Sequence, residues 1–374
     1  MNPLAILRRS GRTVLIVAAI TMMLCEAASF LALEWLKPAA SLPIYEDRLV
    51  SGGRVTAVRG NLNHRWRTSE FDVTIRTNSG GYREDFEFRF ADVEFAFMGD
   101  SFAFGHGVEV SERYTNLFSS RLKGRIDPAH VVSVGRNDGF QPEHYEYFLR
   151  KHPDLRPKFI VVGLYLGNDL EPDVRETRFD RQSLTLDLPY RTTENGQITS
   201  SAPYRIPGLR TLVGISQTAR LFAVTLNHTA YRKYLFEKDA VLPNAYNSDS
   251  LEFGSFNEFS QRAFDSLVNI AGLARERGGR LVVMLIPQNF YAGAVRVPHL
   301  APALWPRIPE ILANGGLRRA VAGRCKDLGL DCIDAGAVMS AEDFFPGDAH
   351  WNREGHRKAA DLLHDYFSAS EGWR

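Results

Sequence analysis

The chain has 374 residues, with 45 lysines and arginines against 44 aspartates and glutamates, which gives a formal net charge of +1. This length can hold one large domain or two modest ones. A balance so close to neutral argues against a nucleic-acid surface, so we predict no nucleic-acid partner. The sequence contains no internal repeat and no low-complexity tract.

An apolar segment covers residues 13 to 36 and follows three arginines that lie between residues 8 and 12. As a helix it would be roughly 36 Å long, enough to cross a bilayer core of about 30 Å. With its positive flank it predicts that residues 1 to 38 form a transmembrane signal anchor. The remainder would then be extracytoplasmic, or periplasmic in a Gram-negative cell. Glu26 interrupts the segment, and a cleaved signal or a buried N-terminal helix are the alternatives.

Apolar runs that are typical of buried parallel strands recur further along the chain, with helical patterns between them. They are VEFAFM (93 to 98), HVVSV (130 to 134), FIVVGLY (159 to 165), RLVVMLI (280 to 286) and DCIDA (331 to 335). Helical spacing is clear at Phe264, Leu267, Val268 and Ala271, and again at Ala359, Leu362, Leu363 and Phe367. Such alternation predicts an α/β fold, with about five parallel strands flanked by helices on both faces.

Two regions do not follow this alternation. Residues 39 to 90 contain turn signals and short extended runs, as in FDVTIRTNSGGYRE, and predict a small β-rich lead-in. Residues 170 to about 255 are rich in Tyr, Arg and Pro, and they predict a partly helical insertion within a domain of residues 91 to 374. The insertion would form a lid or partner surface, or else a passive surface excursion.

Polar residues follow the predicted strands at the edge where ligands collect in open parallel sheets. Ser101 follows the first strand in FMGDSFAFGHGV, and the final strand is followed by FPGDAHWNREGH, which contains Asp348 and His350. A serine becomes nucleophilic when a histidine, oriented by a carboxylate, takes its proton. The Ser101 amide, a glycine amide and the Asn168 side chain could then stabilise the oxyanion. The alternative is that Ser101 is only a turn residue.

These residues, in this order, resemble the SGNH (GDSL-like) hydrolase superfamily over roughly residues 93 to 368. Its four blocks resemble Gly99-Asp100-Ser101, Gly139 in GFQP, Asn168-Asp169, and Asp348 with His350. The resemblance implies a three-layer, flavodoxin-like fold, a Ser101, His350 and Asp348 triad, and an oxyanion hole of Ser101, Gly139 and Asn168. TNSGGYRE also looks like a segment of bacterial membrane-anchored members.

The sequence departs from the family pattern in three blocks. Leu166 occupies the usual glycine position of the third block, and Gly135 or Asn137 could replace Gly139 as the oxyanion contributor. In the last block Gly347 stands where the family has its aspartate, three residues before the histidine. Asp348 lies two residues before the histidine, a spacing that resembles the alginate O-acetyltransferase branch.

These features predict an extracytoplasmic serine esterase that hydrolyses O-acyl esters, acetyl esters above all. Cell-envelope or exported glycans, or small esters, would be its substrates, and the resemblance together with the expected location implies the glycans. The alternatives are a glycan O-acetyltransferase that uses the same residues, and a catalytically silent polysaccharide-binding or scaffold module. We predict no cofactor, and no His or Cys cluster has the spacing of a metal site. Cys325 and Cys332 are either disulfide-bonded or free thiols.

Four other residues near these motifs have ordinary structural interpretations. His106 is expected in a loop or at a helix start, and His356 on the closing helix, facing solvent or capping a turn. Trp351 is expected to pack rather than to stack on a sugar. Arg83 is expected to form a salt bridge in the lead-in rather than to reach the site.

Overall fold

The computed structural model describes residues 3–36, 45–50, 53–68, 70–136, 140–167, 169–170, 178–187, 193–194, 197–198, 216–219, 221–222, 258–287, 316–345 and 350–370. By its internal contacts the chain divides into two compact units. One consists of Met1–Ser41 with Thr193–Lys238, and the other of Leu42–Thr192 with Asp239–Arg374. Most of the predicted insertion lies outside the described residues.

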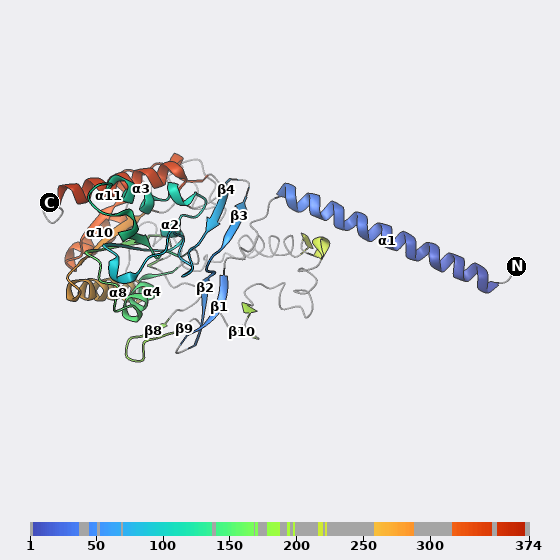
Figure 1. Ribbon diagram of the computed structural model, residues 1–374, viewed down its shortest axis with the longest axis horizontal. Coiled ribbons are helices and arrows are strands. Elements are labelled where there is room, and N and C mark those ends of the chain that lie inside the picture. Colours follow the sequence, from blue (N-terminus) through green and yellow to red (C-terminus); the bar gives the residue numbers. More distant parts are fainter. Residues whose placement is uncertain are drawn as a thin grey trace. The chain divides into compact units, whose positions relative to one another are not determined.

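A five-stranded parallel sheet forms the centre of the larger unit (Figure 1). Its strands are β5 (Phe95–Met98), β6 (Val131–Ser133), β7 (Phe159–Tyr165), β12 (Arg280–Ile286) and β13 (Cys332–Asp334). All five predicted runs are therefore confirmed as strands. The order β6-β5-β7-β12-β13 is the 2-1-3-4-5 order of flavodoxin-like sheets. The order reverses between β5 and β7, and a ligand site is expected there.

Helices cover both faces of this sheet, which confirms the three-layer arrangement. One face packs against α4 (Pro142–Lys151), α8 (Glu258–Glu276) and α10 (Gly316–Asp327), and the other against α3 (Tyr114–Arg121) and α11 (Arg353–Ala369). Because side chains alternate along a strand, Ile160, Val162 and Leu164 of β7 enter the first layer, and Phe159, Val161 and Tyr165 the second. In α8, Phe264, Leu267 and Ala271 are buried, whereas Val268 is 36 % exposed.

The lead-in forms two antiparallel hairpins. β1 (Tyr45–Val50) pairs with β2 (Gly53–Val58), and β3 (Asn63–Arg67) pairs with β4 (Asp72–Arg76). The buried side chains of the second hairpin cluster with residues that follow β5 and with Phe345. The cluster includes Trp66, Phe71, Val73, Ile75, Phe104, Val108 and Phe345. The lead-in is thus β-rich, as predicted, and it packs on the chain that follows β5.

The remaining elements are short. They comprise α2 (Ser101–Phe104), the hairpin of β8 (Arg178–Asp180) with β9 (Thr185–Asp187), and the hairpin of β10 (Thr193–Glu194) with β11 (Gln197–Ile198). Single 3-10 turns occur at Phe90–Asp92, Val110–Glu112, Pro128–His130, Ala335–Ala337 and Ala341–Asp343.

A long helix, α1 (Pro3–Leu36), contains the N-terminal apolar segment (Figure 1). Its apolar side chains Val14, Ile16 and Leu31 are each more than half exposed. The carboxylate of Glu26 accepts hydrogen bonds from the Ser216 hydroxyl and the Gln217 amide. The predicted transmembrane helix is not found, because no helix in the described part of the chain is long and apolar enough to cross a membrane.

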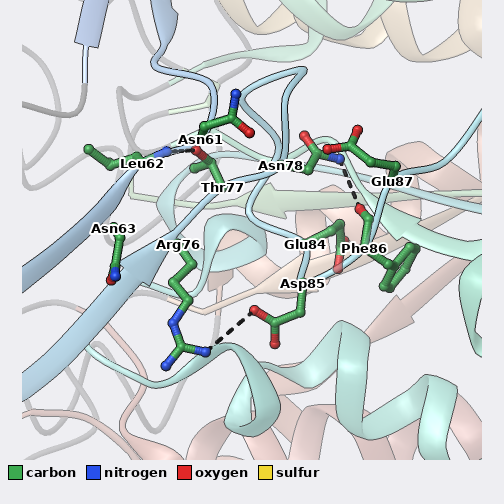
Figure 2. A pocket seen from close by; sticks show the side chains of 10 residues that line it. All are labelled: Asn61, Leu62, Asn63, Arg76, Thr77, Asn78, Glu84, Asp85, Phe86 and Glu87. Atoms are coloured by element: carbon green, nitrogen blue, oxygen red, sulfur yellow. Dashed lines mark hydrogen bonds and ion pairs between the residues drawn. The ribbon is translucent and has the colours of Figure 1, made fainter.

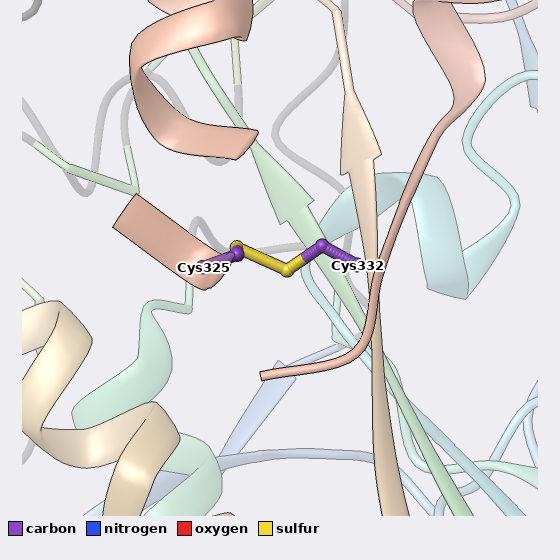
Figure 3. The surroundings of a disulfide bond; sticks show 2 residues. All are labelled: Cys325 and Cys332. Atoms are coloured by element: carbon purple, nitrogen blue, oxygen red, sulfur yellow. A yellow bond between two sulfur atoms is a disulfide. The ribbon is translucent and has the colours of Figure 1, made fainter. Parts of the chain in front are cut away.

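Cys325 and Cys332 form a disulfide (Figure 3). Cys325 lies in α10 and Cys332 begins β13, and their Cα atoms are 6.3 Å apart, within the usual range for a bridge. The bond closes a short turn between a helix of one outer layer and the edge strand of the sheet. Of the two possibilities left by the sequence, the structure has the disulfide.

Candidate active site

The turn that carries Ser101 connects β5 directly to α2. Asp100 caps the helix, because its carboxylate accepts a hydrogen bond from the Phe102 amide at 3.0 Å. A side chain at Gly99 would place its Cβ 2.8 Å from the Cβ of Ala103, so only glycine fits where the chain reverses. Ser101 is thereby held at the carboxyl end of β5, beside the point where the strand order reverses.

His350 meets Ser101 across this edge of the sheet. The Ser101 Oγ lies 2.6 Å from the His350 Nε2, although the two residues are 249 positions apart in the chain. The loop that carries His350 is closed by a bridge between Phe344 and Trp351 and by the Phe345 amide, which donates to the His350 carbonyl oxygen at 3.0 Å. The structure therefore brings together the nucleophile and the base that the sequence predicts.

The other predicted site residues, Asp348, Gly139 and Asn168, lie outside the described residues, as does the alternative Asn137. Their roles remain predictions. Asp343, a second carboxyl near His350 in the sequence, is already engaged, because its Oδ2 accepts bonds from the Ser340 amide at 2.6 Å and the Lys358 ammonium at 2.8 Å.

The chain after β7 explains one departure from the family pattern. The Leu166 amide donates to the Ile286 carbonyl oxygen at 3.0 Å, so the strand pairing extends past Tyr165, and the Leu166 side chain is buried. A glycine is needed one residue later, because a Cβ at Gly167 would lie 2.4 Å from the ring of Tyr165. The turn before position 168 is thus built with its glycine shifted by one residue.

Asp169 fixes the other side of this turn from a buried position. Its Oδ2 accepts a hydrogen bond from the Tyr165 amide at 2.8 Å. Burial first, and then the negative charge of Asp100, raise the pKa of the Asp169 carboxyl well above its usual range. A raised pKa favours the neutral form of the Asp169 carboxyl, which lessens its repulsion with the buried carboxyl of Asp100.

Arg83 and Glu84 of the lead-in are buried beside the nucleophile turn. The Arg83 guanidinium donates to the carbonyl oxygens of Phe104, Gly105 and Val108, the last at 2.6 Å. From the sequence we favoured a salt bridge of Arg83 over a reach toward the site, and this preference was wrong. The salt bridge in this region is made instead by Glu84, which pairs with the buried Arg113 at 2.7 Å.

The three remaining aromatic candidates are Trp351, His356 and His106, and only His106 contacts His350 by stacking. Trp351 is fully buried and packs on Phe102, with ring centroids 5.0 Å apart, as expected. His356 lies on the closing helix, as expected, but its ring is buried instead of facing solvent, and its Nδ1 accepts a hydrogen bond from the Tyr114 amide at the start of α3 at 3.2 Å. Burial lowers the pKa of His356 well below its usual range. His106 lies in a loop, as expected, but its ring stacks on His350.

A cavity of about 610 Å³ lies in the lead-in, apart from the serine and histidine (Figure 2). Polar side chains line most of it, among them Asn63, Arg76 and Asp85. Neither Ser101 nor His350 is among its lining residues, so this cavity is not where the two meet. Among the described residues, no group of three or more His, Cys, Asp or Glu side chains could hold a metal ion.

No protein-family model and no curated protein matches the sequence. Among solved structures the chain is similar to a GDSL-like lipase from Bacteroides thetaiotaomicron, at 10 % identity and a TM-score of 0.34 over 74 % of this chain and 87 % of that one. It is similar to the aryl esterase of M. smegmatis, at 13 % identity and a TM-score of 0.36 over 74 % and 99 %. It is also similar to an extracellular lipase from Streptomyces rimosus, at 13 % identity and a TM-score of 0.36 over 73 % and 99 %. Likeness at this level does not assign an activity, which rests on the chain's own residues.

Proposed function

We propose that this protein is a serine ester hydrolase of the SGNH type. The observation that carries the proposal is the 2.6 Å contact between the Ser101 Oγ and the His350 Nε2, at the edge of a parallel sheet where its strand order reverses. A neutral histidine at this distance is placed to accept the serine proton. A polysaccharide-binding or scaffold module would have no need of such a pair.

The reaction follows from this geometry in two halves. The Ser101 Oγ attacks the acyl carbon while its proton passes to the His350 Nε2, and the negative charge collects on the former carbonyl oxygen. When the ester bond breaks, the alcohol leaves with the proton from His350 and the acyl group stays on Ser101. Water then attacks the acyl-enzyme, again giving its proton to His350, and the acid is released as Ser101 recovers its proton.

Three further parts of the proposal come from the sequence. Asp348 would orient His350, and the Gly139 amide and Asn168 side chain would join the Ser101 amide as oxyanion donors. Acetyl esters of cell-envelope or exported glycans would be the substrates. The Asp348 to His350 spacing, which resembles the alginate O-acetyltransferase branch, favours glycan O-acetyl transfer as the second candidate function.

We also propose that the catalytic unit is exported and attached to a membrane by its N-terminal segment. The arginine flank, the apolar sequence of residues 13 to 36 and the exposed apolar side chains of α1 support this location. The disulfide between Cys325 and Cys332 supports an oxidising compartment. A reporter protein fused after Pro38 should be exported from the cytoplasm. Detection of the reporter in the cytoplasm would contradict the proposal.

One experiment distinguishes the candidate functions. The purified full-length chain is incubated with an aryl acetate, with and without an oligosaccharide acceptor, and the products are identified by mass spectrometry. Release of acetate without acceptor supports the hydrolase, and acetylated oligosaccharide supports the transferase. Failure to form either product, together with no labelling of Ser101 by a fluorophosphonate, would leave only the binding module.

A further inference from the structure

The imidazole rings of His106 and His350 lie face to face. Their centroids are 3.9 Å apart and their planes are inclined by 16°. The nitrogen lone pairs and N–H bonds of an imidazole lie in the plane of its ring, so rings stacked in this way cannot exchange a proton directly. His106 therefore contacts the candidate base through its ring face and does not act as a second base toward it.

The loop that presents His106 is built for this position. Gly105 and Gly107, on either side of the histidine, have φ values of 82° and 78°, which glycine adopts without strain. The His106 amide donates to the Ser101 carbonyl oxygen at 3.0 Å, so the loop is tied to the nucleophile itself. A Cβ at Gly107 would lie 2.5 Å from the ring of Phe345, which leaves no room for a larger residue.

The lead-in supports His106 from its other sides. The ring of Trp66 meets it edge to face at 4.5 Å, and that of Phe71 does so at 5.4 Å. Both aromatic residues are buried. His106 thus lies between two fixed rings of the lead-in and the ring of His350, so its own ring has little freedom to turn.

We propose that His106 is a positioning residue, which holds the His350 ring in the orientation that points its Nε2 at the Ser101 Oγ. The inference rests on the proposed role of His350 as the base. A histidine side chain can rotate about two bonds, and the orientation in the structure gives the 2.6 Å contact with the serine. The ring of His106 occupies the space against one face of the His350 ring, so the His350 ring cannot rotate into that space. Misplacement of a catalytic group by about 1 Å can cost 100-fold in rate.

The test compares the full-length variants His106→Ala and His106→Phe in the hydrolysis of an aryl acetate. The alanine variant loses the stacked face, and we expect kcat to fall about 10- to 100-fold with KM changed less than about twofold. Phenylalanine keeps a flat ring without nitrogen atoms, so we expect its kcat to stay within about threefold of the wild-type value.

The control is His152→Ala. His152 also packs its ring on aromatic side chains, at 4.5 Å from Phe90 and 4.4 Å from Phe148, but it ends α4 on the side from which the chain enters β7, away from Ser101. Its kcat should equal that of the wild type. Melting temperatures of all variants identify any loss of activity that comes from unfolding.

A double variant separates positioning of His350 from other effects. If His106 acts through His350, His106→Ala should lower the residual rate of His350→Ala by less than about twofold. Full activity of His106→Ala, equal losses in the alanine and phenylalanine variants, or additive losses in the double variant would each overturn the inference. A wild-type chain without esterase activity would instead contradict the proposed function.

Discussion

Replacement of Arg83 by methionine should destabilise the protein and slow the reaction together. The Arg83 side chain is 1 % exposed and donates to three main-chain carbonyl oxygens in the loop after Ser101. Methionine fills much of the same volume but donates no hydrogen bond. The three carbonyl groups would then be left buried without this donor.

The expected cost follows from those three bonds. A buried acceptor that loses its donor costs about 1 kcal/mol at the low end, so three cost about 3 kcal/mol in the free energy of unfolding. Burial, and then the charge of Arg113, lower the pKa of Arg83 to about 9. Desolvation of the guanidinium therefore carries a free-energy cost, which the methionine variant avoids. We therefore use the low end of the range, which for a chain of 374 residues corresponds to a melting temperature lower by roughly 4 °C.

Arg89→Met is the matched control in the same lead-in. The Arg89 side chain is 82 % exposed and pairs with Asp92 at 2.7 Å on the surface. Such pairs contribute between about 0 and 1 kcal/mol, so this variant should melt close to the wild type. Thermal unfolding and aryl acetate hydrolysis are measured for both variants, and Arg83→Met should also lose about tenfold in kcat. If it melted and reacted like Arg89→Met, Arg83 could not be holding the nucleophile loop.

Three further predictions concern the site. Ser101→Ala should abolish labelling by a fluorophosphonate while changing the free energy of unfolding by less than about 0.5 kcal/mol, and full labelling of the variant would reject Ser101 as the nucleophile. Asp348→Asn should keep the fold but lower kcat by orders of magnitude, and near-normal turnover would show that Ser101 and His350 act without it. Because the pKa of Asp169 is raised, the folded chain binds a proton that the unfolded chain releases, so the free energy of unfolding falls as the pH rises from about 4 toward the raised value. Asp169→Asn should flatten that slope in melting curves recorded across pH, and an unchanged slope would assign it to other groups.

The sheet could be predicted from the sequence because its strands are buried on both faces. Residues 159 to 165 and 280 to 286 read as continuous apolar runs, and each is one strand with the same bounds in the structure. Ser101 could be placed because it follows such a run. Whether Cys325 and Cys332 are bonded could not be determined, since it depends on how closely α10 approaches β13, which no local pattern encodes.

The residues that sequence reasoning missed act through contacts between distant segments. His106 is separated from His350 by more than half of the chain, and only the fold brings the two rings together. A local signal was present in Gly105-His106-Gly107, because glycines on both sides of a histidine indicate a tightly bent loop. The burial of His356 was missed because the buried face of the amphipathic helix α11 includes this polar residue.

The lead-in and the sheet belong to one compact unit, although composition suggests separate segments. Three kinds of contact join them at the same loop. Arg83 binds its carbonyl groups, Trp66 and Phe71 pack on His106, and the Thr74 amide donates to the Glu109 carboxylate at 2.8 Å. In each contact, the residue on the loop lies within ten positions of Ser101 in the sequence. A chain without the lead-in would lose the side chains that fix the loop after Ser101. The lead-in therefore belongs with the site on physical grounds, as the part that gives Ser101 and His350 a defined geometry.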